Sequence, residues 1–161
     1  VGVYPRGRDH FAVIYNDISE RKQAEAVLRE REERQTFLLR FSDALRAEET
    51  VEGTGHRAVR LIADELALDR VYLVTANPDN DEILVTHEVR RDDMAPLLGM
   101  YHSSDFPTAI REILERPISY ADVRIDPRLT DLDRRSFAGL GAVGFAAVPI
   151  RRGGEQLIWA A

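Results

Sequence analysis

The chain has 161 residues, of which 44% are hydrophobic and 31% charged, and its formal net charge is −6. This composition is typical of one globular domain with some additional chain, and the acidic balance argues against binding of nucleic acid. The absence of cysteine excludes disulfides, thiolate metal sites, thiol catalysis and a thioether-linked cofactor within these residues, and it favours a cytoplasmic location.

The two ends of the sequence show no targeting signal. No apolar run approaches the roughly 20 residues of a membrane span, and the N-terminal residues lack the basic-then-apolar layout of a signal peptide. The chain begins at Val1 and stops within "QLIWAA", which reads as an interrupted strand. We therefore expect it to be a piece of a longer protein.

The first residues predict a β-hairpin. Two β-prone runs, residues 1–4 and 11–15, are joined by Pro5, Gly7 and Asp9, which are typical turn residues. Two strands alone are marginally stable in water, so further strands must come from elsewhere.

A long helix is predicted directly after the second strand. Asp17 and Glu20 form a capping-box-like start, and neither Gly nor Pro follows until Gly53. If the helix is unbroken to about residue 47, its length is roughly 45 Å. Its heptad-like stripe consists of Ala24, Val27, Arg31, Arg34, Leu38, Phe41 and Leu45. A strand that enters such a helix without a loop favours a rod that dimerises and transmits movement, although residues 37–45 fit equally well as a face packed on the next domain.

The remaining residues predict alternating helices and strands. Tight turns at residues 77–81 and 151–154 indicate antiparallel pairing, so the expected class is α+β. The predicted helices cover residues 58–66, 107–115 and 132–140, and the predicted strands cover residues 70–76, 82–89, 118–122, 142–150 and 155–161.

The sequence contains no recognisable enzyme signature. Gly139, Gly141 and Gly144 match the spacing of a dinucleotide-binding loop, but a helix precedes them and a strand follows, which favours a helix C-cap instead. The four histidines are far apart in sequence and predict no metal site. Nucleophile-elbow, zincin and phosphate-loop patterns are missing, so no catalytic residue is predicted within this chain.

The stretch "AVIYNDISERKQAEAVLRE" resembles the end of a PAS sensor domain, whose last strand runs through an Asp-Ile-Ser/Thr signature into a signalling helix. The resemblance implies that residues 1–17 are the last strands of an incomplete PAS domain and residues 18–36 a coiled-coil signalling helix. It gives Asp17, Ile18 and Arg21 a role in relaying the signal.

The stretches "YHSSDFPTAIREILERPISYADV" and "FAGLGAVGFAAVPIRRGGEQLIWAA" resemble the phytochrome-like branch of GAF domains. This implies a GAF domain over residues 37–161, truncated at its C-terminus, with an antiparallel sheet flanked by helices. In that family a small molecule, or nothing, lies on one face of the sheet under the loops that here carry Asp105 and Asp126. The usual host is a bacterial sensor histidine kinase, with diguanylate cyclases as another, and the catalytic domain would lie downstream.

The sequence departs from that branch at its chromophore residues. The branch binds a bilin through a cysteine, so covalent bilin binding is excluded within this chain. Its loop histidine is replaced by Leu129 and Thr130, and the isoleucine of its Asp-Ile-Pro motif by Phe106. The Asn-Lys-x-x-x-Phe-Asp-Glu pattern of the cyclic-nucleotide branch is missing, so the cofactor or ligand stays unknown.

The residues expected around a small-molecule pocket each have a structural alternative. Asp105 also suits the N-cap of the helix at residues 107–115, the histidines suit a half-exposed surface, and the aromatic residues suit a core. The candidate ligand-binding residues are Asp105, Phe106, Tyr72, His87, His102, Tyr101, Arg111 and Asp126. Two functions are left open: a dimeric sensory region that responds to a ligand, and a dimerisation module whose pocket is filled by its own side chains. A chromophore or haem sensor ranks last, because the residues that would hold such a group are missing.

Overall fold

The computed structural model describes residues 2–5, 11–14, 18–152 and 155–161. The chain forms two compact units, Val1–Ser42 and Asp43–Ala161.

The first unit holds the predicted hairpin and most of the long helix. Strands β1 (Gly2–Pro5) and β2 (Phe11–Ile14) pair antiparallel, with Gly2 opposite Ile14. Helix α1 (Ser19–Arg46) ends close to the predicted residue. The predicted hairpin and long helix are therefore confirmed, whereas Asp17 lies outside the described residues.

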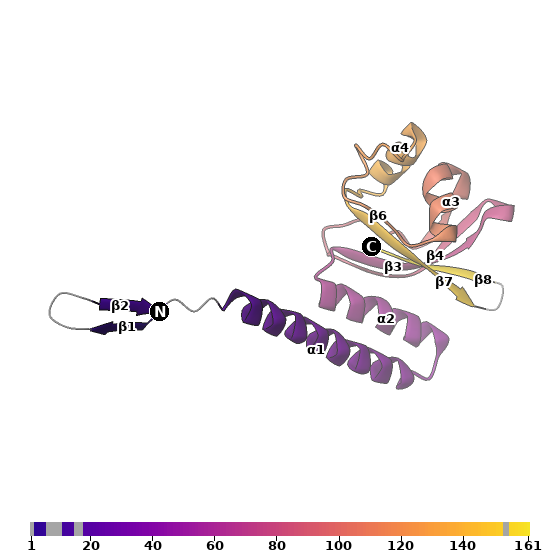
Figure 1. The fold of residues 1–161 in the computed structure, drawn as a ribbon. Coiled ribbons are helices and arrows are strands. Elements are labelled where there is room, and N and C mark those ends of the chain that lie inside the picture. Colours follow the sequence, from indigo (N-terminus) through magenta and orange to yellow (C-terminus); the bar gives the residue numbers. More distant parts are fainter. Residues whose placement is uncertain (1, 6–10, 15–17, 153–154) are drawn as a thin grey trace. The chain divides into compact units, whose positions relative to one another are not determined.

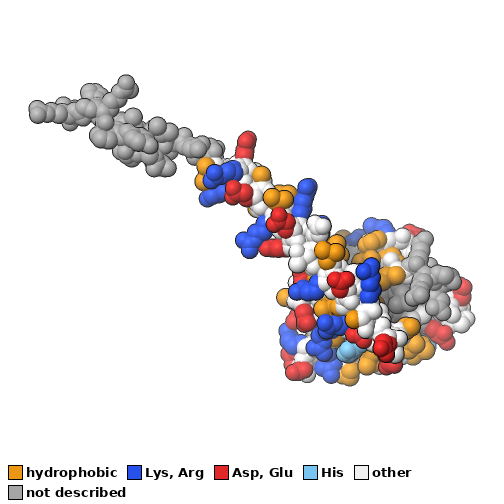
Figure 2. All heavy atoms as spheres, turned by 90° about the horizontal axis from the view of Figure 1, so that it is seen from below, with side chains coloured by type: hydrophobic (Ala, Val, Ile, Leu, Met, Phe, Trp, Pro, Cys, Tyr) orange, Lys and Arg blue, Asp and Glu red, His pale blue; other side chains and the backbone are white. Residues whose placement is uncertain are grey.

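The surface of α1 is charged over most of its length, as Figure 2 shows by its interleaved acidic and basic side chains. Arg21 pairs with Glu25 at 3.5 Å, one of several exposed ion pairs spaced four residues apart. Such pairs add little stability because water screens them. Val27 and Leu28 are 49% and 57% exposed, so this helix presents apolar side chains to solvent within a charged surface.

The second unit is a six-stranded antiparallel sheet with helices on both faces (Figure 1). Its strand order is β5-β4-β3-β8-β7-β6. The strands are β3 (Arg70–Asn77), β4 (Glu82–Arg90), β5 (Gly99–Tyr101), β6 (Ile118–Tyr120), β7 (Phe145–Arg152) and β8 (Glu155–Ala160). The helices are α2 (Val51–Leu66), α3 (Pro107–Glu115) and α4 (Asp131–Gly139), with single turns η1 (Pro78–Asn80) and η2 (Ser103–Asp105). The predicted α+β class is confirmed.

Each face of the sheet has its own core. Helix α2 covers one face, where Val59 and Ala63 pack on Val71 and Leu73 of β3. Helices α3 and α4 cover the other face over a larger cluster of buried aliphatic and aromatic side chains. Strand β3 contributes to both cores, and five consecutive residues of it, Arg70–Val74, are therefore buried.

Helix α2 begins seven residues earlier than predicted, at Val51 rather than Ala58. Thr50 is its N-cap, and the hydroxyl oxygen of Thr50 accepts a hydrogen bond from the Gly53 amide at 2.9 Å. Gly53 and Gly55 consequently lie inside the first turns. Their low helix propensity was outweighed by the cap and by tight packing of the helix on the sheet.

A β-bulge interrupts the pairing of β3 with β4. Val74 lies opposite Val85, but Leu73 lies opposite His87, so Thr86 is an extra residue. One inserted residue reverses which side chains face which side of a sheet. As a result, β4 turns Val85 toward α3 and α4, and two positions later it turns His87 toward α2.

Asp133 caps two helices at once. Its carboxylate accepts hydrogen bonds from the amide and hydroxyl of Thr130 at the start of α4, and from the amides of Thr108 and Ala109 at the start of α3, the latter two at 3.1 and 3.2 Å. The sequence predicted Asp105 as the cap of α3. That prediction is wrong, because Asp133 supplies the acceptor from 25 residues further along the chain.

The Asp133 carboxylate is fully buried. Burial by itself would raise the pKa of Asp133, but the hydrogen bonds from Thr130, Ala109 and Thr108 outweigh it, and the pKa lies below the usual range. The carboxylate is thus charged when folded, and it ties α3 to α4.

We expect Asp133→Ala to lower the free energy of unfolding by about 3 kcal/mol, because two helix starts lose their acceptor. Urea unfolding followed by circular dichroism would measure this. The matched control is Asp131→Ala at an 84% exposed position of the same helix, which should change stability by less than about 0.5 kcal/mol. Equal effects would contradict the double cap.

The contribution of Asp133 to stability should also depend on pH. Because folding lowers the pKa of Asp133, its contribution to the free energy of unfolding should be present above the unfolded pKa of about 3.9 and lost as the pH falls through the folded pKa.

Candidate functional site

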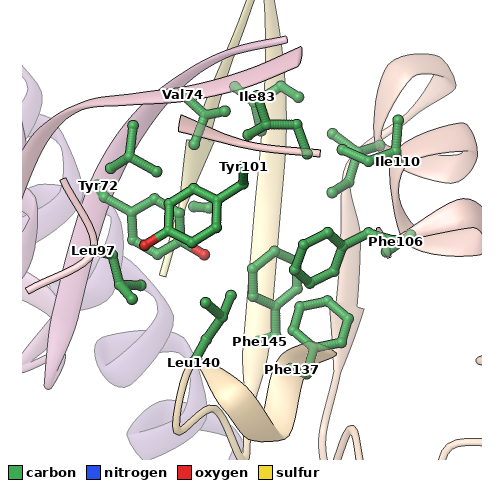
Figure 3. Close-up of a pocket in the computed structure, with 15 residues that line it drawn as sticks. Tyr72, Val74, Ile83, Leu97, Tyr101, Phe106, Ile110, Phe137, Leu140 and Phe145 are labelled. Carbon is green, nitrogen blue, oxygen red and sulfur yellow. The ribbon is translucent and has the colours of Figure 1, made fainter. Parts of the chain in front are cut away.

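A small apolar cavity lies between the sheet and helices α3 and α4. Its volume is about 60 Å³. The described residues that line it include no charged side chain, and their polar groups are the phenols of two tyrosines. Figure 3 draws the lining residues, which are Tyr72, Val74, Ile83, Val85, Leu97, Tyr101, Phe106, Ala109, Ile110, Ile113, Phe137, Leu140, Phe145, Ile158 and Ala160.

One end of the cavity is aromatic. The ring of Phe137 lies 5.2 Å from that of Phe106 and 4.8 Å from that of Phe145, measured between centroids. Tyr120 stacks on Phe145 at 6.2 Å. Edge-on and offset contacts of this kind are favourable beyond their buried area, so this end is firmly packed.

The opposite end carries the two phenols of Tyr72 and Tyr101, which Figure 3 shows on the side of Leu97. Burial is the largest cause that raises the pKa of each phenol above its ordinary value, and the carboxylate of Glu88 adds to it. Both phenols are therefore neutral at physiological pH. Each can donate one hydrogen bond and accept another.

A buried ion pair stands beside these phenols. The Nε atom of Arg70 lies 3.4 Å from a carboxylate oxygen of Glu88, and the two side chains are only 9% and 3% exposed. Arg70 also donates to the carbonyl oxygens of Leu140 at 3.2 Å and Ala95 at 2.6 Å. The Glu88 carboxylate accepts from the amide of Leu97 at 3.0 and 3.2 Å. Buried charges need such partners, since an uncompensated one is very costly.

Three of the eight candidate site residues line the cavity, namely Tyr72, Tyr101 and Phe106. His87 does not. It lies on the opposite face of the sheet, where its Nε2 atom is 3.1 Å from the carbonyl oxygen of Glu52 in α2. The physical reason is the bulge at Thr86, which turns His87 away from the face that Val85 occupies.

The polar candidates near η2 lie outside the cavity. His102 is 3.3 Å from a carboxylate oxygen of Asp81, and both side chains are substantially exposed. Asp81 accepts further hydrogen bonds from Ser103 and Ser104, which lower the pKa of Asp81 and tie η2 to the end of η1. Asp105 itself is exposed.

The two remaining candidates serve the surface of the domain. Arg111 is exposed on α3. Asp126 accepts two hydrogen bonds from the guanidinium of Arg128, which lies 4.5 Å above the ring of Tyr120. These contacts organise the loop before α4, and neither residue lines the cavity.

Sequence reasoning missed Arg70 and Glu88. Charged residues are rarely buried unless they are paired, so ones near strand ends read as solvent-facing. A regular alternation along β4 would also have placed Glu88 on the α2 face. The available signal was a charged residue at corresponding ends of two strands joined by a tight turn, and it becomes informative only once the register is known.

Among the described residues, no three His, Cys, Asp or Glu side chains converge as metal ligands. Within the same residues, no helix has the length and apolarity needed to cross a membrane.

No protein-family model and no curated protein matches the sequence. Solved structures do match. The GAF domain of a cyanobacterial phytochrome with bound phycoerythrobilin aligns with a TM-score of 0.64 at 17% identity, covering 79% of this chain and 78% of that one. A GAF domain from a phosphoenolpyruvate-protein phosphotransferase of Coxiella burnetii aligns with a TM-score of 0.58 at 18% identity, covering 78% and 74%.

The chromophore-binding domain of a Stigmatella aurantiaca phytochrome also aligns, with a TM-score of 0.63 at 15% identity. That match covers 78% of this chain and 50% of the other. The six-stranded sheet with its flanking helices is therefore a GAF fold of the phytochrome-like kind, as the sequence predicted.

The cavity does not fit a bilin. A linear tetrapyrrole carries two carboxylates and needs a site of several hundred Å³, whereas this cavity has about 60 Å³ and the described lining residues offer no cation. With no cysteine in the sequence, a covalent link is excluded as well.

We expect Gly55→Ala to destabilise the protein by about 2 kcal/mol, because a methyl group there would lie 2.6 Å from Nε2 of His87. In a His87→Ala background the penalty should fall by more than 1 kcal/mol, which a double-mutant cycle of urea unfolding would measure. Gly139→Ala is the matched control, since a methyl group there has no neighbour within 4 Å, and it should be neutral or slightly stabilising. A harmless Gly55→Ala would contradict the contact between α2 and His87.

Proposed function

We propose that this chain is a sensory region of a multidomain bacterial signal-transduction protein, in which the GAF domain binds a small molecule in the cavity under α3 and α4. The observation that carries this proposal is a small apolar cavity with two neutral phenols at one end, in a GAF fold. Similar solved domains hold a small molecule, the bilin of the cyanobacterial phytochrome. The host we favour is a cytoplasmic sensor histidine kinase whose catalytic domain lies downstream, with a diguanylate cyclase as the alternative.

The proposed organisation is the one expected from the sequence. Residues 1–17 would close a PAS domain, residues 18–36 would form the signalling helix, and residues 37–161 the GAF domain. Asp17, Ile18 and Arg21 would relay the state of the PAS domain into α1. The antiparallel pairing of β1 with β2 and the start of α1 at Ser19 support this organisation.

A second function is favoured by the small size of the cavity. At about 60 Å³ it is largely filled by its own aliphatic and aromatic lining. A GAF domain packed in this way can act as a dimerisation module that binds no ligand, with α1 as the contact between two chains.

Native mass spectrometry of protein purified from cells distinguishes the two functions. We expect an added mass that dissociates on denaturation and is lost in Ala109→Val, because Ala109 is 1% exposed and lines the cavity, which the two extra methyl groups would fill. The matched control Ala138→Val, at an exposed position of α4, should keep the added mass. No added mass in any of the three proteins would favour the dimerisation module.

Insertions in α1 test whether its apolar stripe joins two chains. One alanine inserted after Arg31 rotates the following turns by about 100° relative to the preceding ones, whereas seven inserted residues restore the stripe. We expect the single insertion to weaken self-association at least tenfold in sedimentation equilibrium and the seven-residue insertion to leave it nearly unchanged. Equal association for both variants would rule out dimerisation through this stripe.

A further inference from the structure

A groove of about 660 Å³ adjoins the cavity at the end of the sheet where β3 begins. It runs between residues 91–97 and the loop of residues 140–144. Tyr72, Leu97, Leu140 and Phe145 line both the cavity and the groove. These four side chains therefore form the partition between the small apolar cavity and the larger groove, and Figure 3 shows Leu97 on the side of the cavity where the two tyrosines lie.

The backbone at both leucines is held by the same buried ion pair. The amide of Leu97 donates to the carboxylate of Glu88, and the carbonyl oxygen of Leu140 accepts from the guanidinium of Arg70. Arg70 also holds the carbonyl oxygen of Ala95, two residues before Leu97. Two segments that are distant in sequence are thus held by Arg70 on β3 and Glu88 on β4. The Nε atom of Arg90 lies 3.9 Å from the second carboxylate oxygen of Glu88 and is a further, weaker partner.

The cavity is too small to admit a ring while this partition is closed. An engineered cavity that binds benzene has a volume of about 150 Å³, more than twice the value here. Typical small-molecule sites are larger, at about 300 to 1,000 Å³. The cavity joined to the groove reaches that range, and the two leucines are the side chains that must move.

We propose that the Arg70–Glu88 pair is a latch on this partition, and that cavity and groove together form one site for a neutral, elongated, mostly apolar molecule with a hydrogen-bonding group near Tyr72 and Tyr101. The inference of a ligand rests on the proposed sensory function. The ligand is neutral because the cavity lining offers no counter-charge and the charged residues that line the groove already have partners. Arg70 pairs with Glu88, and Arg91 pairs with Asp69 and Asp93. A charged group that displaced Glu88 or Arg70 would leave the other member of a buried pair uncompensated.

Hydrogen exchange tests the latch without any ligand. In Glu88→Gln the side chain can still accept from Leu97, but its charge is gone, so Arg70 loses its buried counter-charge and keeps only its carbonyl partners, Leu140 and Ala95. We expect amide exchange to accelerate at least tenfold at Leu97 and also at Ala142, across the partition, while the amides that join β3 to β8 keep their rates. Faster exchange at Leu97 alone, or at neither position, would overturn the latch.

Two further variants provide a fallback and a control for the exchange experiment. If Glu88→Gln fails to fold, the uncharged double variant Arg70→Met with Glu88→Gln removes the pair without leaving a buried charge, and the same two amides should respond. The matched control is Asp93→Asn, which breaks an exposed ion pair with Arg91 in the same segment. Its exchange pattern at Leu97 and Ala142 should equal that of the wild type.

Binding of 2-naphthol, a neutral two-ring probe with one hydroxyl, tests the ligand class. Stopped-flow fluorescence should show association and dissociation at least tenfold faster in Glu88→Gln than in the wild type, and 2-naphthoate, which is charged, should bind at least tenfold more weakly. Unchanged rates would overturn the latch. If 2-naphthol binds to no variant, the proposed ligand class and sensory site fail, whereas the exchange experiment still decides whether the latch exists.

Discussion

The extra residue at Thr86 decides the chemistry of both faces of the sheet. Without it, the period of two along β4 would place His87 beside Val85 on the cavity face and turn Glu88 toward α2. Arg70 would then lack its carboxylate, and α2 would meet a glutamate where it now meets a histidine tied to the carbonyl oxygen of Glu52. One irregular residue therefore decides which face of the sheet receives His87 and which receives Glu88.

The sequence predicts those parts of the fold that depend on neighbouring residues. The helix Pro107–Glu115 follows from its proline start and apolar spacing, and the hairpins follow from tight turns between apolar runs. The features that the sequence does not predict depend on contacts between distant residues. The cap of α3 comes from Asp133 because α3 and α4 pack together, and no local rule that favours Asp105 can anticipate a carboxylate so far along the chain.

The candidate site residues also fall into those that the sequence predicts and those that depend on distant contacts. Tyr72, Tyr101 and Phe106 were found because large apolar side chains in a small domain go inside, and the cavity lies within that core. The charged and polar candidates lie outside the cavity because short polar side chains in the loops bond to their own surroundings, as Asp81 does with Ser103 and Ser104. The buried charges were overlooked because burying a charge is costly unless a partner is present, and that partner depends on the strand register.

A buried ion pair is a poor device for stability alone, since well-packed apolar residues in the same place are often equally stable. Parting Arg70 from Glu88 leaves charges that must be hydrated, and Arg70 lines the adjoining groove, so a closed and an open arrangement are separate states. The apparent affinity for a ligand is then its intrinsic affinity multiplied by the fraction of open molecules, so a protein open about 1% of the time binds about a hundredfold more weakly than one held open. Glu88 also directly follows His87, which is bonded to α2 on the other face. A change of state at the latch is therefore one residue away from the helix that covers the opposite side of the sheet.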